Sequence, residues 1–493
     1  MEMEPSTDKP PVNSSVRQTE LTLQTPNGLT GDRWLIIVAV GLGSLMSSLD
    51  SSVVNIILPV VSQAFRTDVA TIEWVVTVYL LVVSGLLLSF GRLGDMHGNK
   101  QVYIYGFGIF VVGSMLCGLS STALMLISFR GLQAIGAAIL FANSPALLTK
   151  NFPASLRGRV LGLQSMMIYI GLTIGPILGG WLTALLSWRA VFYINVPIGL
   201  AALYLSVRYI PHDAPAEHAP RFDLPGAGTF LAGLTMLLLG LNQGDVWGWT
   251  SWPELLLFAV SIVLLVLFVV IEIHTPSPML DLHLFSVRQF SAATVSAVCN
   301  YISLNVATFL LPFYLIEGRG LNTATTGLIL SAQPIIMAIS APLSGALSDR
   351  VGPRILGTLG MLVLGAGMFL LSRLGADASM VMVALGLAVV GLGTGVFIAP
   401  NSSALMGSAP RVRQGIASGI LATARNMGMV LGVGLAGAVL AASTGTTVSQ
   451  PGSGAFGQEL FTAVGIGMLI AAAVALFGAL TSSVRGSVDS LAQ

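Results

Sequence analysis

Two charged residues lie in stretches of sequence that are otherwise apolar, and their chemistry is the first indication of function. Asp50 lies in the run 49–59, LDSSVVNIILP, and Arg130 lies in the run 123–149. A charged side chain at the centre of a bilayer costs roughly 2.5–3.5 kcal/mol on insertion scales, so an intramembrane acid indicates a functional site by default. The alternative is a structural ion pair with Arg130 or Arg425, the two cations within predicted spans. A pair and a function can coexist.

The depths of the two residues can be compared if the N-terminus lies inside the cell. Helix 34–60 then runs outward and helix 123–149 runs inward. At about 1.5 Å per residue, Asp50 lies roughly 24 Å above the inner boundary and Arg130 roughly 10 Å below the outer one, in a core about 30 Å thick. The two side chains can therefore meet, or share a polar network, in the outer half of the first helical bundle.

This pairing could couple proton movement to a conformational change. Burial favours the neutral form of a carboxyl group, and a nearby guanidinium favours its charged form. A rearrangement that alters both effects would load a proton on one side and release it on the other. Each charge that moves inward gains about 2.3 kcal/mol per 100 mV. We expect Asp50 to carry the coupling proton and Arg130 to tune it.

The composition is that of a polytopic membrane protein. Of 493 residues, 54% are hydrophobic and 9% charged, and the mean hydropathy is +0.85, whereas soluble domains carry about 25% charged residues. The net charge of +1 offers no basic face for nucleic acid. Cys117 and Cys299 lie far apart and imply no disulfide framework. The polar segment 1–33 lacks signal-peptide features and is expected to be a disordered cytoplasmic tail.

Fourteen apolar runs are long enough to cross the membrane as helices. They span residues 34–60, 72–93, 102–121, 123–149, 158–186, 189–209, 226–243, 254–273, 289–316, 325–348, 355–374, 378–407, 414–443 and 458–483. The third and fourth runs are separated only by the turn 120–122. The predicted organisation is a tail 1–33, a six-helix bundle 34–209, a linker 210–288 with two extra helices, a six-helix bundle 289–483 and a cytoplasmic tail 484–493.

Lys and Arg alternate between the loops as the positive-inside rule requires. With the N-terminus inside, sixteen of the 22 basic residues fall in internal segments and four in external ones, and Arg130 and Arg425 fall within helices. Both termini are therefore expected in the cytoplasm.

One motif occurs in both halves. The pattern Gly-x-Leu-x-Asp-x-x-Gly spans 91–98 after the second helix and 345–352 after the tenth. Such a repeat is typical of transporters built of two related bundles with the substrate site between them. The glycines permit a tight turn, and the acid could accept hydrogen bonds from a facing helix N-terminus. This predicts a conformational latch made of Gly91, Asp95, Gly98, Lys100, Asp349 and Arg350. A plain turn with a solvated acid stays open for both copies.

These features together resemble the major facilitator superfamily and, within it, the fourteen-helix drug:proton antiporters. The resemblance rests on the runs 49–59, 91–100 (GRLGDMHGNK), 130–136 (RGLQAIG), 171–180, 188–197 (WRAVFYINVP) and 425–428 (RNMG). It implies a major facilitator fold, with two pseudo-symmetric six-helix bundles plus two inserted helices. Asn99-Lys100 replaces the usual consecutive basic residues, and Ala134 replaces the usual glycine, which weakens the transfer of loop details.

The run 171–180 is similar to the antiporter motif of that superfamily, whose residues here are Gly171, Gly175, Pro176, Gly179 and Gly180. Glycines every four residues form a stripe that lets a second backbone approach closely, and a proline adds a kink. The alternative is ordinary close packing. The resemblance favours an interface that changes as the bundles rock.

Polar, aromatic and methionine side chains on several helices could form an adaptable substrate pocket. The candidates are Asn55, Met166, Tyr169, Asn300, Tyr301, Asn305, Phe309 and Arg425. Plain helix packing is the alternative for each. Arg425 has no acid at matching depth in its half, so it either lines the cavity or bonds backbone carbonyls at a broken turn. A single intramembrane acid suits neutral or monocationic lipophiles better than dications.

The leading functional hypothesis is export of lipophilic small molecules such as drugs, antibiotics or dyes, driven by protons moving inward. Export or flipping of a lipid or an endogenous metabolite is the alternative, and a non-transporting membrane sensor is the alternative of a different class. The sequence has no HExxH motif and no phosphate-binding loop, which argues against an enzyme or an ATP-driven pump. We expect protons as the coupling ion, no other cofactor or metal, contact with membrane lipid, a monomer, and a bacterial inner membrane.

Overall fold

The computed structural model describes residues 31–67, 69–213, 222–248, 251–275, 278–280, 282–444 and 458–484. Within these ranges the chain forms helices and their connections, without strands. The segments 1–33 and 484–493, expected to be tails, lie outside the described residues except for 31–33 and 484.

Helices follow one another in the expected order of six, two and six. The first six crossings are α2 (Gly31–Phe65), α3 (Val69–His97), α4 (Asn99–Leu119), α5 (Ala123–Asn151), α6 (Arg157–Leu185) and α7 (Ala190–Tyr193) with α8 (Asn195–Tyr209). The inserted pair is α9 (Leu224–Trp247) and α10 (Trp252–His274). The last six are α11 (Arg288–Phe313), α12 (Thr323–Leu330) with α13 (Ala332–Val351), α14 (Pro353–Leu371), α15 (Met380–Ser408), α16 (Gln414–Thr444) and α17 (Gln458–Ser483).

Thirteen of these crossings are long and apolar enough to span a membrane, and α9 contributes a shorter apolar stretch, Leu224–Gly240. The all-helical membrane fold expected from the sequence is thereby confirmed. The short turn between α4 and α5 has a local cause. Ser120 is extended, with ψ of 138°, and the Thr122 side chain caps α5 by accepting from the Met125 N–H at 3.2 Å. A threonine at this position satisfies one of the free N–H groups of a helix start.

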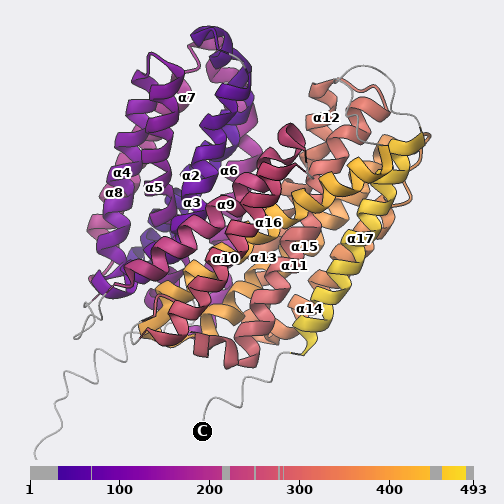
Figure 1. Ribbon diagram of the computed structural model, residues 1–493. Helices are drawn as coiled ribbons and strands as arrows, with labels where there is room; N and C mark the ends of the chain where they lie inside the picture. Colours follow the sequence, from indigo (N-terminus) through magenta and orange to yellow (C-terminus); the bar gives the residue numbers. More distant parts are fainter. Residues whose placement is uncertain are drawn as a thin grey trace, which may run out of the picture.

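The six helices of each half pack into a bundle. The bundles meet mainly where α3 packs on α16 and α6 packs on α13, and α5 also contacts α16 and α6 also contacts α15. In Figure 1 the indigo and purple helices of the N-terminal bundle and the orange and yellow helices of the C-terminal bundle converge at one end of the molecule and diverge toward the end that carries α7 and α12. The last turns of α3 and α13, which contain Asp95 and Asp349, lie at the converging end.

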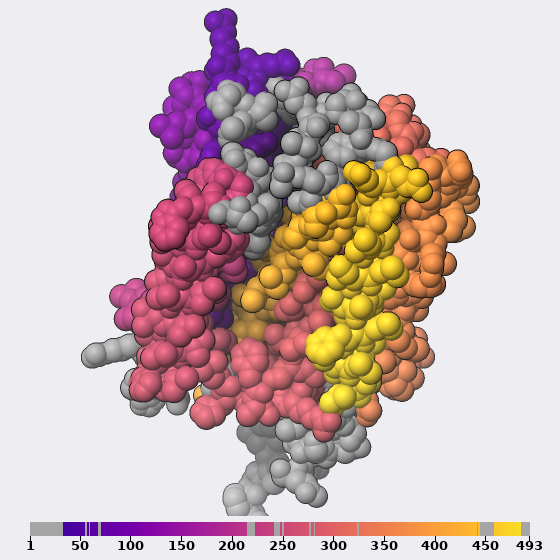
Figure 2. Space-filling view, turned by 45° about the vertical axis from the view of Figure 1, so that its right-hand side comes forward, coloured from indigo at the N-terminus to yellow at the C-terminus, as the bar shows by residue number. Residues whose placement is uncertain are grey.

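The inserted helices lie outside both bundles. α9 packs on α10 and on α3, where the absence of a side chain at Gly85 leaves room for Leu231. Much of α10 is apolar and uncovered, including Ile262 at 61% and Val263 at 64% exposure. Figure 2 shows the pair as the rose-coloured column on the left of the surface. An apolar helix face of this kind is suited to contact with lipid.

Candidate functional site

Asp50 and Arg130 form an ion pair inside the N-terminal bundle. Arg130 Nη1 donates to Asp50 Oδ2 at 2.6 Å, and the side chains are 0% (Asp50) and 1% (Arg130) exposed. Asp50 comes from α2 and Arg130 from α5, whose opposite directions bring the two residues to the same depth. The structure therefore brings together the two charged residues that the sequence placed at similar depth.

Other side chains complete the bonding of this pair. Gln133, one turn after Arg130, donates Nε2 to Asp50 Oδ1 at 2.9 Å and accepts from Arg130 Nη1 at 2.9 Å. Asn195 at the start of α8 donates to Asp50 Oδ1 at 2.9 Å, and Arg130 Nε donates to the Val75 carbonyl at 3.3 Å. A buried ion pair is tolerated when further hydrogen bonds satisfy its atoms. Sequence reasoning missed Gln133 and Asn195 as site residues, although both lie within motif runs.

Tyr79 of α3 lies between this ion pair and the space between the bundles. The Arg130 guanidinium carbon is 4.1 Å from the centroid of the Tyr79 ring, which is within the range of a cation–π contact. The Tyr79 hydroxyl is buried and has no hydrogen-bond partner among the described residues, and Tyr79 lines the central cavity. Asp50 and Arg130 do not line that cavity. Tyr79 therefore contacts the ion pair on one side and lines the cavity on the other.

The cavity has a volume of about 460 Å³ and lies between α2, α3, α5 and α6 on one side and α11 to α13, α15 and α16 on the other. Its wall combines apolar side chains with neutral hydrogen-bonding groups such as Gln164, Asn305 and Gln333. Arg425 is the one charged residue among its described lining residues. A pocket that is mostly apolar with a few polar groups is typical of small-molecule sites.

The predicted cavity residues divide into two groups. Tyr169, Tyr301, Asn305 and Arg425 line the cavity. Three others do not line this cavity. Met166 lines a separate outer crevice between α6 and α13, Asn300 Nδ2 donates to Met361 Sδ at 3.5 Å, and Phe309 packs beside Phe313 at a centroid distance of 5.4 Å. The side chain of Asn55 lies outside the described residues.

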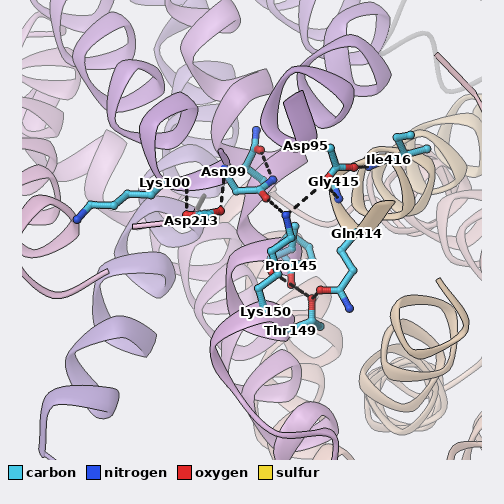
Figure 3. A network of polar contacts seen from close by, with 12 residues as sticks. Asp95, Asn99, Lys100, Pro145, Thr149, Lys150, Asp213, Gln414, Gly415 and Ile416 are labelled. Atoms are coloured by element: carbon cyan, nitrogen blue, oxygen red, sulfur yellow. Dashed lines mark hydrogen bonds and ion pairs between the residues drawn. The ribbon is translucent and has the colours of Figure 1, made fainter. Parts of the chain in front are cut away.

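Asp95 joins the two bundles at the converging end. Its Oδ1 accepts from the Gly415 N–H and its Oδ2 from the Ile416 N–H, both at 2.8 Å. These donors belong to the first turn of α16, where N–H groups are unpaired and negative charge is favoured. Lys150 Nζ lies 3.3 Å from Asp95 Oδ1. Figure 3 shows Asp95 and Lys150 side by side and facing the start of α16.

Asp349 makes the matching connection in the opposite direction. Its Oδ1 accepts from the Gly158 N–H at 2.7 Å and its Oδ2 from the Arg159 N–H at 2.9 Å. The receiving turn opens α6 of the N-terminal bundle. Each carboxylate therefore holds the start of a helix that belongs to the other bundle, and neither is a plain solvated turn.

The glycines of the two motifs serve the same geometry. A Cβ on Gly91 would lie 2.4 Å from the Gly415 carbonyl oxygen, and one on Gly345 would lie 2.2 Å from that of Gly158. At the turns, Gly98 has φ of 92° and Gly352 has φ of 86°, a region that only glycine adopts without strain. Close backbone approach and turn geometry thus both depend on glycine.

Two members of the predicted latch do not take part in it. Lys100 Nζ donates to the Val207 carbonyl at 3.0 Å, within its own bundle, and the exposed side chain of Arg350 has no ion pair in the described part of the chain. The cation at Asp95 is Lys150, which the sequence did not single out. It lies one residue from Thr149, whose hydroxyl bonds Gln414 Oε1 across the bundles at 2.9 Å.

The glycine stripe of α6 packs against a helix of its own bundle. Gly171, Gly175 and Gly179 face α2 of the same bundle, and a Cβ on any of them would meet α2 at 2.7 Å or less. Gly180 has nothing within 4 Å. The helix that these glycines contact in this structure is therefore α2, and a change of this interface as the bundles rock stays a prediction.

Pro176 lies inside α6 and cannot donate a backbone hydrogen bond. Ser52 of α2 reaches this region, since its hydroxyl donates to the Gly171 carbonyl at 3.3 Å. The glycines of α6 that approach the other bundle are Gly158 and Gly162, whose added Cβ atoms would meet α13 at 2.4 and 2.7 Å.

Comparison with known proteins gives consistent matches. A family model described as Major Facilitator Superfamily matches residues 40–295 and 293–490. The chain is 33% identical over 401 residues to the riboflavin transporter RibZ of Clostridioides difficile (81% of this chain, 86% of that protein). It is 32% identical over 420 residues to the tetracenomycin C resistance and export protein of Streptomyces glaucescens (85% and 78%).

Among solved structures, the proton:xylose symporter XylE with a bound glucose derivative superimposes with a TM-score of 0.63 at 15% identity, covering 91% of this chain and 94% of that one. At this identity the likeness concerns the fold alone.

Proposed function

The chain belongs to the major facilitator superfamily and is a multi-pass membrane transporter, and from that premise we propose that it exports lipophilic small molecules in exchange for protons. The substrate would occupy the cavity between the bundles, and the proton would bind Asp50. The two sites would be exposed alternately to the two sides of the membrane as the bundles rock. Export, rather than uptake, follows the name of the Streptomyces relative.

The observation that carries proton coupling is the fully buried Asp50, bonded to Arg130, Gln133 and Asn195. As a carboxylate it holds α2, α5 and α8 together through these donors. A proton on Asp50 would weaken its attraction to Arg130, because a neutral acid accepts hydrogen bonds less strongly than a charged one. Protonation would thereby loosen the contacts among three helices that surround one side of the cavity.

The two carboxylate latches supply the conformational element. With Asp95 and Asp349 bonded to opposing helix starts, the converging end is closed. Opening that end requires both carboxylates to leave the first turns of α16 and α6. The energy of these charge-assisted bonds therefore sets part of the equilibrium between the two arrangements.

Transport by purified protein in proteoliposomes tests the proposal. A pH gradient and a membrane potential are imposed, and movement of a lipophilic fluorescent dye against its gradient is followed in the wild type and in Asp50→Asn at matched protein levels. Asp50→Asn keeps size and polarity but cannot titrate. We expect it to lose uphill transport and to keep downhill dye exchange.

Glu254→Gln is the matched control, because Glu254 is also 0% exposed but lies on the inserted helix α10, away from the ion pair. It should keep uphill transport. If Asp50→Asn still drives uphill export at the wild-type rate, the proton binds elsewhere and Asp50 has a structural role.

A further inference from the structure

Arg425 gives the central cavity a single positive charge. Its residue number places it roughly 16 Å along α16 at 1.5 Å per residue, near the middle of a membrane span. It lines the cavity, as do its neighbour Asn426 and the facing Tyr169 and Tyr301. No Asp or Glu is among the described lining residues. A guanidinium keeps its charge inside proteins, so this charge is permanent.

Within the described residues, the Arg425 guanidinium has no hydrogen bond or ion pair. Its identified contact is the ring of Phe141 on α5, with the guanidinium carbon 4.7 Å from the ring centroid. That contact crosses from one bundle to the other, as does the bond from Asn426 Nδ2 to Ser84 Oγ at 2.9 Å. A ring face attracts a cation but leaves its five N–H groups without acceptors.

Asp50, the intramembrane acid on which the expected substrate charge was based, does not face the cavity. Asp50 is bonded to Arg130 behind Tyr79 and does not line the cavity. The sequence-based preference for neutral or monocationic lipophiles over dications assumed that the intramembrane acid faces the substrate, and in this structure the acid does not line the cavity. A cation in this cavity would meet Arg425 with no carboxylate to offset the repulsion.

Resting on the exporter function proposed above, we propose that the cavity selects lipophilic aromatic molecules bearing one negative charge, and that Arg425 recognises that charge. The apolar wall and the tyrosines receive the body of the ligand, and its carboxylate or phenolate occupies the free donors of Arg425. Export of an anion also moves negative charge outward, which an inside-negative potential assists by about 2.3 kcal/mol per 100 mV. Neutral lipophiles would bind more weakly, and cations most weakly.

Binding of three pyrene compounds with the same aromatic body and tether tests this directly. 1-Pyrenebutyrate is anionic, 1-pyrenebutanol neutral and 1-pyrenebutylamine cationic at pH 7.4. Their fluorescence is titrated with the detergent-purified full chain. We expect the affinity order butyrate, butanol, butylamine for the wild type. Charged hydrogen bonds of this kind correspond to about 10- to 100-fold in affinity between the first two.

Substitutions then assign the preference to Arg425. Arg425→Met should lose the advantage of butyrate and leave butanol within about two-fold, while Arg425→Lys should keep the order. The matched control is Arg373→Met, because Arg373 also stacks on a ring, Phe369, at 4.7 Å but is exposed and outside the cavity. Arg373→Met should leave the affinities for all three pyrene ligands unchanged.

An equal or reversed order in the wild type would overturn the proposal, even if Arg425→Met fails to fold. So would an equal loss of all three ligands in a folded Arg425→Met. Binding in detergent requires no proton gradient, so either result would leave the Asp50 test of proton-coupled export unaffected. Conversely, uphill transport by Asp50→Asn would overturn the coupling proposal without altering the ligand order.

Discussion

Arg130 and Arg425 are the same side chain in the two bundles, and their surroundings are opposite. Arg130 is 1% exposed and bonded to Asp50, Gln133 and the Val75 carbonyl. Arg425 faces the cavity, and in the described part of the chain its guanidinium contacts the Phe141 ring without a hydrogen bond or ion pair. The charge of Arg130 is neutralised by Asp50 inside the N-terminal bundle, whereas the charge of Arg425 faces the cavity between the bundles.

The difference between the two arginines indicates that two bundles with the same repeated motif can have different functions. The latches are nearly equivalent, since Asp95 and Asp349 each accept two N–H bonds from the other bundle. The buried charges are not equivalent. In the proposed mechanism the N-terminal bundle binds the proton and the C-terminal bundle recognises substrate charge. Tyr79 contacts Arg130 and also lines the cavity.

The largest expected difference between the two arginines is in stability. Arg130→Met leaves Asp50 buried without its cation, and breaking a buried pair costs about 3–5 kcal/mol. Arg425→Met removes a cation–π contact of about 0.5–2 kcal/mol. Thermal unfolding in detergent should therefore show a large fall in Tm for Arg130→Met and a small one for Arg425→Met.

The double variant Asp50→Asn with Arg130→Met should recover part of the fall in Tm seen in Arg130→Met, because a neutral side chain at position 50 needs no cation. Similar Tm values for the two single variants would contradict the contrast between a paired and an unpaired arginine.

Substitutions in the latches should have intermediate effects that leave charge selectivity unchanged. Asp95→Asn keeps one acceptor oxygen and loses the charge, so turnover should fall by about ten-fold, which corresponds to one charged hydrogen bond. Asp349→Asn should have a smaller effect, because Asp95 is only 3% exposed and pairs with Lys150, whereas Asp349 has no ion pair in the described residues. Turnover in vesicles and ligand binding in detergent are the two measurements.

Equal losses of turnover and of binding by a folded Asp95→Asn would remove the latch assignment. A change in the order of the pyrene ligands would show that the latches and the cavity are not separate functions.

The smallest effect is expected at Tyr79. Tyr79→Phe keeps the ring over Arg130 and removes a hydroxyl that has no partner among the described residues, so uphill transport should stay within about two-fold of the wild type. Tyr79→Leu removes the ring and should reduce uphill transport by several-fold, in line with a cation–π contact. Uphill rates are compared with downhill exchange in the same vesicles. If Tyr79→Phe reduces uphill transport more than Tyr79→Leu does, the hydroxyl and not the ring transmits the coupling.

The sequence was sufficient for the helices and for the buried pair because both follow from periodic physical requirements. A span needs about 20 apolar residues, and a fixed rise per residue gives the depth of Asp50 and Arg130. The latch acids could be inferred because an acid at the end of a helix, just before a glycine turn, has a limited choice of partners. Their actual donors, such as the Gly415 and Gly158 N–H groups, depend on which helices meet across the bundles.

The errors concern the rotation of helices about their axes. The rotation of α11 about its axis decides whether Asn300 faces the cavity or bonds Met361, and the rotation of α6 decides which helix Gly171 contacts. Long flexible side chains are also unpredictable, which is why Lys150 rather than Lys100 reaches Asp95. Helix rotation and the partners of long side chains are determined by packing between elements distant in sequence, so they cannot be predicted from local residue patterns.

Proton movement caused by substrate tests the central claim most directly. Proteoliposomes loaded with a pH-sensitive dye receive a gradient of transported substrate, and internal pH is followed in the wild type, Asp50→Asn and Arg425→Met. We expect substrate-driven proton movement in the wild type and none in Asp50→Asn, although its downhill exchange continues. Arg425→Met should still move protons with a neutral substrate. Substrate-driven proton movement at the wild-type rate in Asp50→Asn would contradict the assignment of coupling to the buried pair.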